Sequence, residues 1–214
     1  MRFSSIPDAD VIRTVSEAAT TSILILGSKF LAAIAQSGTV SDATEYLHLR
    51  SRRYPDASHH CWAYRIGRPG ELIERSSDAG EPSGTAGRPI LDALRGEHLE
   101  NVICVVTRYF GGTKLGTGGL VRAYADAANA VISEAGFVEQ KVVRLITLDF
   151  DHERTGIVYR ALEEFGVHFH QGHYDERAHG HIEVPQSRVS LLHHRITELT
   201  RSGVDWNEGE LRLK

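Results

Sequence analysis

Basic side chains flank a run of glycines in the middle of the chain, where five of the nine residues from 111 to 119 are glycine. An apolar strand pattern at residues 102–106 precedes this glycine loop (residues 111–119), and an alanine-rich helical pattern at 120–135 follows it. The first N–H groups of a helix have no partner within the helix, so they attract anions. The loop therefore predicts an anion or nucleic-acid site. Its candidate residues are Arg108, Gly111, Gly112, Lys114, Gly116, Gly118, Gly119 and Arg122.

The spacing of the glycines differs from that of two common phosphate-binding motifs. The loop has no Gly-Lys-Ser/Thr and is therefore not a P-loop. Counted from Gly116, the third glycine of a dinucleotide-binding fingerprint would fall on Val121. Each glycine lowers stability by roughly 0.5–1 kcal/mol relative to alanine, so we expect positive φ angles or a close backbone approach here. A tight structural crossover against a sheet is the alternative to a ligand site.

A second loop, the acidic loop (residues 76–87), combines carboxylates, hydroxyls and glycines. Its Asp78 and Glu81 could ligate a hard cation such as magnesium, or act as general acid and base. No third oxygen-ligand motif accompanies them, and the short polar side chains of such loops often hydrogen-bond to nearby backbone. We therefore favour a tightly turned structural loop, and we predict neither a metal site nor a bound cofactor.

Cys61 follows two histidines, a pattern that could indicate a nucleophile. Adjacent strand residues point to opposite faces, so His60 is poorly placed to act as a base for Cys61. His59 could reach the face of Cys61, but no third, orienting group is visible. A buried structural cysteine is the expectation.

Eight of the twelve histidines lie in the second half of the chain. On a predicted hairpin of residues 167–174 and 179–184, one face could carry His168, His170, His179 and His181. A zinc or nickel site is conceivable there. Without a cysteine or a closed geometry, we expect a solvated polar sheet face instead.

The composition is that of an ordinary globular protein, with 41% hydrophobic and 24% charged residues and a net charge of −4. A protein that binds duplex nucleic acid through its whole surface would normally be basic, so any nucleic-acid site must be a local patch. Only two cysteines occur, without metal or redox spacing. With no signal-peptide pattern and no apolar segment of membrane length, the sequence predicts a cytoplasmic protein without a membrane partner.

Strands and helices alternate irregularly in the first half. Short strands are expected at 23–26 and 30–35, followed by a helix that is capped by Ser41 or Asp42 and ends near Tyr54. Two further strands, at 61–66 and 72–75, are expected to pair across a turn at 68–70. A short helix is expected from Pro89 to Gly96.

The second half follows the order β-α-β-β-α-β, the split ferredoxin-like arrangement. The expected elements are 142–150, 155–165, 167–174, 179–184, 187–201 and 206–213. No linker rich in Pro, Gly or Ser separates the halves, so topology sets the boundary at 139–142. The sequence thus predicts an α+β fold with two domains, residues 1–140 and 141–214.

Four motifs together resemble the IMPACT family, and specifically its bacterial YigZ-like members. They are Gly-Ser-Lys-Phe-Leu-Ala at 27–32, Ala-Ser-His-His-Cys-Trp-Ala-Tyr at 57–64, Gly-Glu-Pro-Ser-Gly-Thr-Ala-Gly at 80–87, and Arg-Tyr-Phe-Gly-Gly at 108–112 with Gly-Leu-Val-Arg-Ala-Tyr at 119–124. The last of these is highly specific. The C-terminal half resembles the family more loosely, through its topology and Thr155-Gly156. Ala79 stands where the family usually has a second aspartate beside Asp78, which weakens a metal or acid–base role for the loop.

The resemblance implies an N-terminal β-α domain similar to domain IV of elongation factor G, and a C-terminal domain similar to the ferredoxin-like modules of that factor. Eukaryotic IMPACT proteins regulate translation initiation under amino-acid starvation, a stress response. For the bacterial branch, the resemblance implies a nucleic-acid or ribosome-associated role with no established reaction.

We therefore expect a translation-associated regulatory protein that binds RNA or the ribosome through its glycine loop. Further candidates for the same face are His59, Asp78, Glu81, Ser83 and Thr85. The alternative is a phosphate-handling hydrolase or phosphotransferase that uses Asp78, Glu81 and His59 as its chemical groups. A protein partner could also bind the ferredoxin-like sheet.

Overall fold

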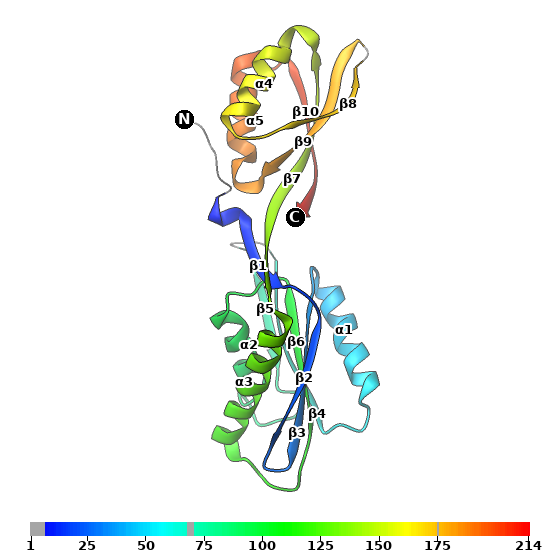
Figure 1. The fold of residues 1–214 in the computed structure, drawn as a ribbon, viewed down its shortest axis with the longest axis vertical. Coiled ribbons are helices and arrows are strands. Elements are labelled where there is room, and N and C mark those ends of the chain that lie inside the picture. Colours follow the sequence, from blue (N-terminus) through cyan, green and yellow to red (C-terminus); the bar gives the residue numbers. More distant parts are fainter. Residues whose placement is uncertain (1–6, 68–70, 175) are drawn as a thin grey trace. The chain divides into compact units, whose positions relative to one another are not determined.

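A computed structural model describes residues 7–67, 71–174 and 176–214 (Figure 1). The described residues group into an N-terminal unit, residues 13–139, and a C-terminal unit, residues 140–214 together with 7–12. Within the described part of the chain the protein has two sheets and five α-helices. The predicted α+β fold class is confirmed.

A five-stranded antiparallel sheet forms the centre of the N-terminal unit, in the order β2-β3-β6-β4-β5. Its strands are β2 (Ala19–Ile25), β3 (Ser28–Gln36), β4 (His59–Ile66), β5 (Ile73–Ser77) and β6 (Val102–Tyr109). The central strand β6 is buried along residues 102–108, because helices cover both faces of the sheet. The turn expected at 68–70 lies outside the described residues.

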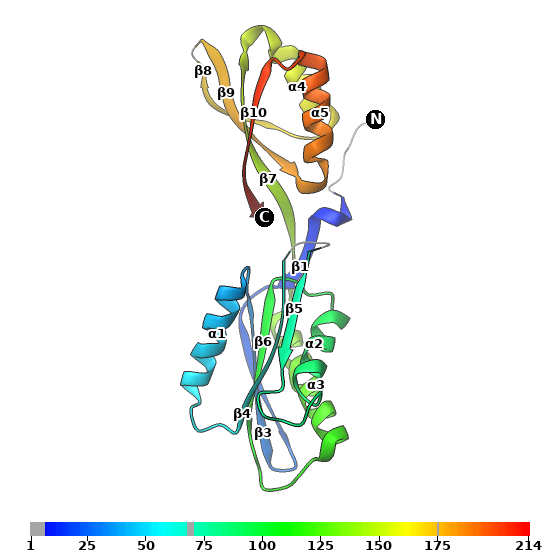
Figure 2. The same cartoon turned by 180° about the vertical axis from the view of Figure 1, so that it is seen from behind.

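Three helices cover this sheet from two sides (Figures 1 and 2). Helices α2 (Gly87–Gly96) and α3 (Gly116–Ala135) pack on one face, where Phe30, Leu94 and Tyr124 are buried. Helix α1 (Val40–Arg53) packs on the other face. The glycine loop leads from β6 into the first turn of α3, which begins at Gly116, and the acidic loop leads from β5 into α2. Both loops therefore lead into helices on the same side of the sheet.

Two helix starts differ from the sequence prediction. Helix α1 is capped by Thr39 rather than by Ser41 or Asp42. Thr39 Oγ1 accepts from the backbone N of Asp42 at 3.1 Å, and Asp42 Oδ2 accepts from the backbone N of Thr39 at 3.0 Å. This reciprocal pair is a capping box, which requires the acidic residue at the third helical position. Helix α3 begins at Gly116, before the predicted start at residue 120.

The C-terminal unit has the predicted β-α-β-β-α-β order. Its elements are β7 (Phe137–Asp151), α4 (Thr155–Glu164), β8 (Phe169–Tyr174), β9 (Arg177–Pro185), α5 (Val189–Thr200) and β10 (Val204–Leu213). The strand order β10-β7-β9-β8 is antiparallel throughout, which is the ferredoxin-like arrangement. Both helices pack on one face, over Ile146, Leu148 and Phe150. Residue 175, between the two strands of the predicted hairpin, lies outside the described residues.

One strand was not expected from the sequence. The short β1 (Val11–Val15) pairs with β7 and joins the second sheet. The expected boundary at 139–142 falls inside β7, which runs without interruption from Phe137 to Asp151. No helix among the described residues is both long and apolar enough to cross a membrane.

Candidate functional site

The glycine loop needs glycine at particular points for steric reasons. A Cβ atom on Gly111 would lie 1.9 Å from the carbonyl carbon of Gly27 in the β2–β3 turn, so only glycine allows the two backbones to approach this closely. The backbone N of Gly111 also donates to Ser28 Oγ at 3.2 Å. Gly116, the first residue of α3, has a φ of +71°, a left-handed conformation that glycine adopts at little cost. The loop is thereby fixed against β3 before α3 begins.

Helix α3 begins without a capping side chain. Its N-cap is Leu115, and no hydrogen bond from a side chain of the described residues reaches its first turn, which contains no acidic residue. The exposed residues Gly116, Thr117 and Gly118 form that turn. Lys114 is also exposed and precedes the turn directly. The helix start therefore presents uncapped N–H groups and a cation to solvent, the combination that an anion requires.

Arg108, by contrast, is buried and paired. Its side chain is only 6% exposed, and its Nη1 donates to Glu81 Oε1 at 2.6 Å. Nη2 donates to Ser28 Oγ at 3.2 Å, and Nε has no hydrogen-bond partner in the described structure. Tyr124 donates its hydroxyl to the same Glu81 oxygen at 2.8 Å. Glu81 is thus the acceptor that joins the acidic loop to β6 and α3.

The Asp78 carboxylate is occupied by the backbone of its own loop and of the α2 start. Oδ2 accepts from the backbone N of Gly84 at 2.8 Å, and Oδ1 accepts from Ala86 N at 2.9 Å and Gly87 N at 2.8 Å. Burial raises the pKa of this carboxyl, but the three donors together outweigh burial, so its pKa lies below the ordinary value. These bonds support the structural interpretation of the loop and leave Asp78 poorly placed as a metal ligand or catalytic base.

Two other members of the predicted face lie in the same loop. Thr85 is buried, and its hydroxyl donates to the carbonyl of Pro82 at 2.7 Å. Ser83 is exposed. These contacts do not bring the side chain of Ser83 or Thr85 to the α3 start.

Cys61 is a buried thiol rather than a nucleophile. Its Sγ donates to the carbonyl of Asp78 at 2.9 Å and lies 3.3 Å from the Tyr124 hydroxyl. Burial raises the pKa of the thiol to about 12, so that it is protonated at neutral pH. His60 bonds to Thr107 Oγ1 at 3.1 Å instead of reaching the thiol. His59 Nδ1 bonds to the carbonyl of Ala79 at 2.9 Å, and its Nε2 lies 3.9 Å from Glu81 Oε1.

A cavity of about 360 Å³ opens where these elements meet. Its wall is formed by Glu81, Pro82, Arg108, Phe110, Lys114, Leu115, Gly116, Thr117 and Leu120. Of the residues predicted from the sequence, the cavity brings together Arg108, Lys114, Gly116 and Glu81. The other predicted residues lie outside its wall, namely His59, Asp78, Ser83, Thr85, Gly111, Gly112, Gly118, Gly119 and Arg122. The sequence reasoning did not identify Phe110, although it directly precedes the glycine run.

The charges in the cavity wall leave it net positive. Glu81 and Arg108 neutralise each other through their ion pair, and Lys114 then adds one positive charge. The start of α3 contributes the equivalent of about half an elementary charge of the same sign. The cavity can therefore hold an anion without Arg108 as a direct ligand.

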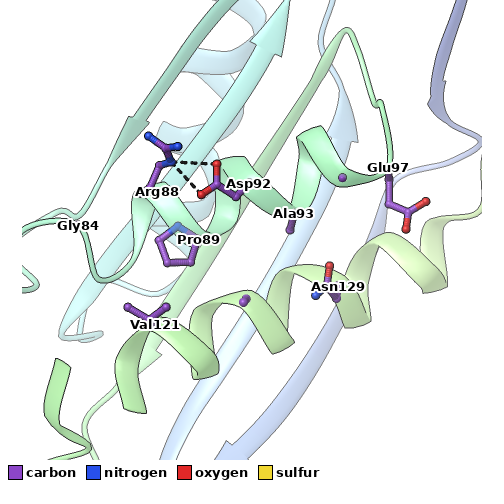
Figure 3. Close-up of a pocket in the computed structure, with 10 residues that line it drawn as sticks. Gly84, Arg88, Pro89, Asp92, Ala93, Glu97, Val121 and Asn129 are labelled. Atoms are coloured by element: carbon purple, nitrogen blue, oxygen red, sulfur yellow. Dashed lines mark hydrogen bonds and ion pairs between the residues drawn. The ribbon is translucent and has the colours of Figure 1, made fainter. Parts of the chain in front are cut away.

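A larger groove of about 490 Å³ lies between α2 and α3 (Figure 3). Its lining includes the small residues Ala93, Gly96 and Ala125, whose short side chains leave space between the two helices. At its rim, Arg88 Nε donates to both carboxylate oxygens of Asp92, at 2.9 and 2.8 Å. No sequence motif marks this groove.

Three residues of the predicted histidine face, His170, His179 and His181, lie on β8 and β9 of the C-terminal unit, whereas His168 precedes β8. His170 lies opposite His181 on the neighbouring strand, and their stacked rings are 5.3 Å apart between centroids. His179 Nδ1 is 2.6 Å from Asp149 Oδ2. Across the described residues, no group of three or more His, Cys, Asp or Glu side chains has an arrangement that would hold a metal ion.

Comparison with known proteins identifies the family of the chain. The family model of the Impact N-terminal domain matches residues 26–132. IMPACT family member YvyE of Bacillus subtilis is 36% identical over 92% of this chain and 91% of its own length. Its relative YigZ of Escherichia coli is 37% identical over 61% of this chain and 65% of its own length.

A crystal structure described as that of a hypothetical protein matches with a TM-score of 0.66 and 26% identity. The match covers 94% of this chain and 98% of that protein. The similarity in sequence and in structure therefore extends over both units. The chain belongs to the IMPACT family.

Proposed function

We propose that this protein is a cytoplasmic, translation-associated regulatory protein that binds RNA, free or in the ribosome, through the start of α3. The observation that supports this most directly is the uncapped first turn of α3 beside Lys114, at the mouth of a net positive cavity. RNA supplies phosphates that such a helix start can bind with its backbone N–H groups.

The charge of the whole chain is consistent with a small, local contact. The net charge of −4 does not attract a polyanion in general, so binding depends on the patch formed by Lys114, Arg122 and the helix start. Arg122 is exposed on the first turns of α3 and lies outside the cavity wall, where it can contact a neighbouring phosphate. Arg108 contributes indirectly, because it neutralises Glu81.

Family membership supports the link to translation. Eukaryotic IMPACT proteins regulate translation initiation, and this chain belongs to the same family. The geometry of the site supplies an independent reason to expect an anionic partner.

The enzyme alternative receives less support from the geometry. Asp78 accepts three backbone hydrogen bonds, and Glu81 accepts from Arg108 and Tyr124. Both carboxylates therefore hold the loop in place. A phosphate-handling enzyme would need at least one of them to be available for proton transfer or metal ligation.

The test is the binding of fluorescent tRNA, ribosomal RNA fragments and purified ribosomes at a series of salt concentrations. We expect the affinity to fall as salt rises, and Lys114→Ala and Arg122→Ala each to reduce the salt slope by about 1. Arg52→Ala is the matched control, since it removes an exposed cation from α1 on the opposite face of the sheet. Salt-independent binding, or equal losses for all three variants, would contradict the proposal.

A further inference from the structure

The cavity at the α3 start also indicates which part of an RNA it accepts. We infer that it takes a terminal nucleotide of single-stranded RNA that carries a phosphomonoester, an inference that rests on the proposed function.

Size limits the ligand to about one nucleotide. The cavity volume of about 360 Å³ lies near the lower end of the range of about 300–1,000 Å³ for small-molecule pockets. That space suits a single base with its sugar and phosphate, whereas a duplex could only touch the rim. Single-stranded RNA offers such a unit, because its bases are unstacked and accessible.

The wall has the two kinds of surface that a nucleotide needs. Lys114, Gly116 and Thr117 are its cationic, N–H-rich part, and Pro82, Leu115 and Leu120 are its apolar part. Phe110 also belongs to the wall and is 51% exposed. The Arg108 guanidinium lies 5.5 Å from the centroid of the Phe110 ring, a contact that positions the ring. An exposed, positioned aromatic ring beside a cation is the usual platform for stacking an RNA base.

Burial of the charged residues favours the terminal nucleotide of an RNA chain over an internal one. The side chains of Glu81 and Arg108 are 3% and 6% exposed, so they close the inner side of the cavity. An internal nucleotide must let the chain leave in two directions, whereas a terminal one needs only one exit. A terminal phosphomonoester also carries a charge of about −1.5 to −2 at pH 7, more than the −1 of a phosphodiester. The net positive wall therefore favours the terminal group.

Two features of the floor suit the rest of the nucleotide. Glu81 Oε1 accepts from Arg108 and Tyr124, so the neutralised Glu81 side chain closes the floor without repelling a phosphate. Arg108 Nε is buried without a hydrogen-bond partner in the described structure, so this guanidinium retains an unused donor beside the cavity. Buried polar groups without partners are rare in proteins, and a bound ligand would explain this one.

The experiment compares single-stranded RNA decamers of one sequence that carry a 5′-phosphate, a 3′-phosphate or only hydroxyl ends, by fluorescence anisotropy with the full chain. We expect one phosphorylated end to bind at least tenfold more tightly than the hydroxyl form, and Lys114→Ala to remove that difference. Phe110→Ala should weaken binding by roughly 5- to 100-fold through loss of stacking, while Phe110→Trp should retain it. Arg52→Ala is the control for the positive charge that Lys114→Ala removes.

The outcomes separate this inference from the proposed function. Equal affinity for all three decamers, with binding still dependent on salt and on Lys114, would overturn the terminal site and leave the proposed function intact. Absence of binding to any RNA would overturn both. If a free nucleoside monophosphate binds as tightly as the phosphorylated decamer, the ligand is a free nucleotide and the RNA-end inference fails.

Discussion

The acidic loop and the glycine loop each lead from a strand into a helix on the same side of the sheet, but the two helix starts are built differently. At α2, the Asp78 carboxylate accepts from Ala86 N and Gly87 N and so occupies the helix start from within the protein. At α3, no side chain of the described residues caps the first turn. A carboxylate already holds the position at α2 that an external anion would take at α3. The comparison indicates which loop is structural and which is available to a ligand.

The Glu81–Arg108 pair joins the acidic loop to β6, and its loss should have the largest effect on stability. Glu81→Ala leaves the buried Arg108 charge without its partner, so we expect the free energy of unfolding to fall by about 3–5 kcal/mol. Urea denaturation measures it. Lys114→Ala, which removes an exposed cation from the open loop, should change stability by no more than about 0.5 kcal/mol. Similar losses for both variants would contradict the distinction between the loops.

Removal of the Asp78 carboxylate should have the next largest effect. Asp78→Ala leaves three backbone N–H groups without their acceptor, and we expect a loss of about 2–3 kcal/mol in the free energy of unfolding. The matched control is Asp92→Ala, since this exposed carboxylate pairs only with surface arginines and should contribute less than about 1 kcal/mol. A loss at Asp78 no larger than at Asp92 would contradict the capping role.

The same carboxylate should make stability depend on pH. The folded pKa of Asp78 lies below its unfolded value of about 3.9, so its stabilising contribution is fully present above that pH and is lost as the pH falls through the folded pKa. Denaturation of the wild type and of Asp78→Asn at pH 2.5, 4 and 6 measures this. The difference in stability between the two proteins should shrink toward the lowest pH. A constant difference would show that the ionised form is not the one stabilised.

Within the glycine loop, two alanine substitutions should have opposite signs. Gly111→Ala places a Cβ atom 1.9 Å from the Gly27 backbone, and we expect a loss of about 1–3 kcal/mol. Gly118→Ala meets nothing within 4 Å and lies inside α3, so it should stabilise by up to about 1 kcal/mol. Thermal unfolding of both variants tests this contrast. Destabilisation by Gly118→Ala would mean that the helix start needs glycine there for another reason.

The smallest expected change in stability tests the open helix start directly. Thr117→Asp adds a carboxylate to the first turn of α3 and should stabilise the protein by about 0.3–1 kcal/mol through the helix dipole. The same carboxylate should repel RNA phosphate and weaken binding about tenfold or more. The control is Thr117→Asn, because asparagine has nearly the same shape as aspartate but carries no charge. Parallel changes in stability and affinity, instead of opposite ones, would contradict a shared anion position.

Local sequence patterns were sufficient for much of the fold. The apolar pattern of the second half predicted the ferredoxin-like order, because alternation and helical periodicity are local properties. The short strand β1 was missed, since its pairing with β7 involves residues more than a hundred positions away. The start of α3 was placed too late, because glycine is a poor helix former on average, whereas Gly116 begins the helix with a positive φ.

For the candidate site, the sequence by itself determined the residue types, the glycine loop at a helix start and the family. It could not determine which charges face solvent. Arg108 and Lys114 are both basic residues beside the same loop, yet the first is buried against Glu81 and the second is exposed. Only the tertiary structure decided this, because the partner of Arg108 comes from another loop that the sheet brings alongside β6. Arg108 and Glu81 are 27 residues apart in the sequence, and the fold brings their charged atoms to 2.6 Å.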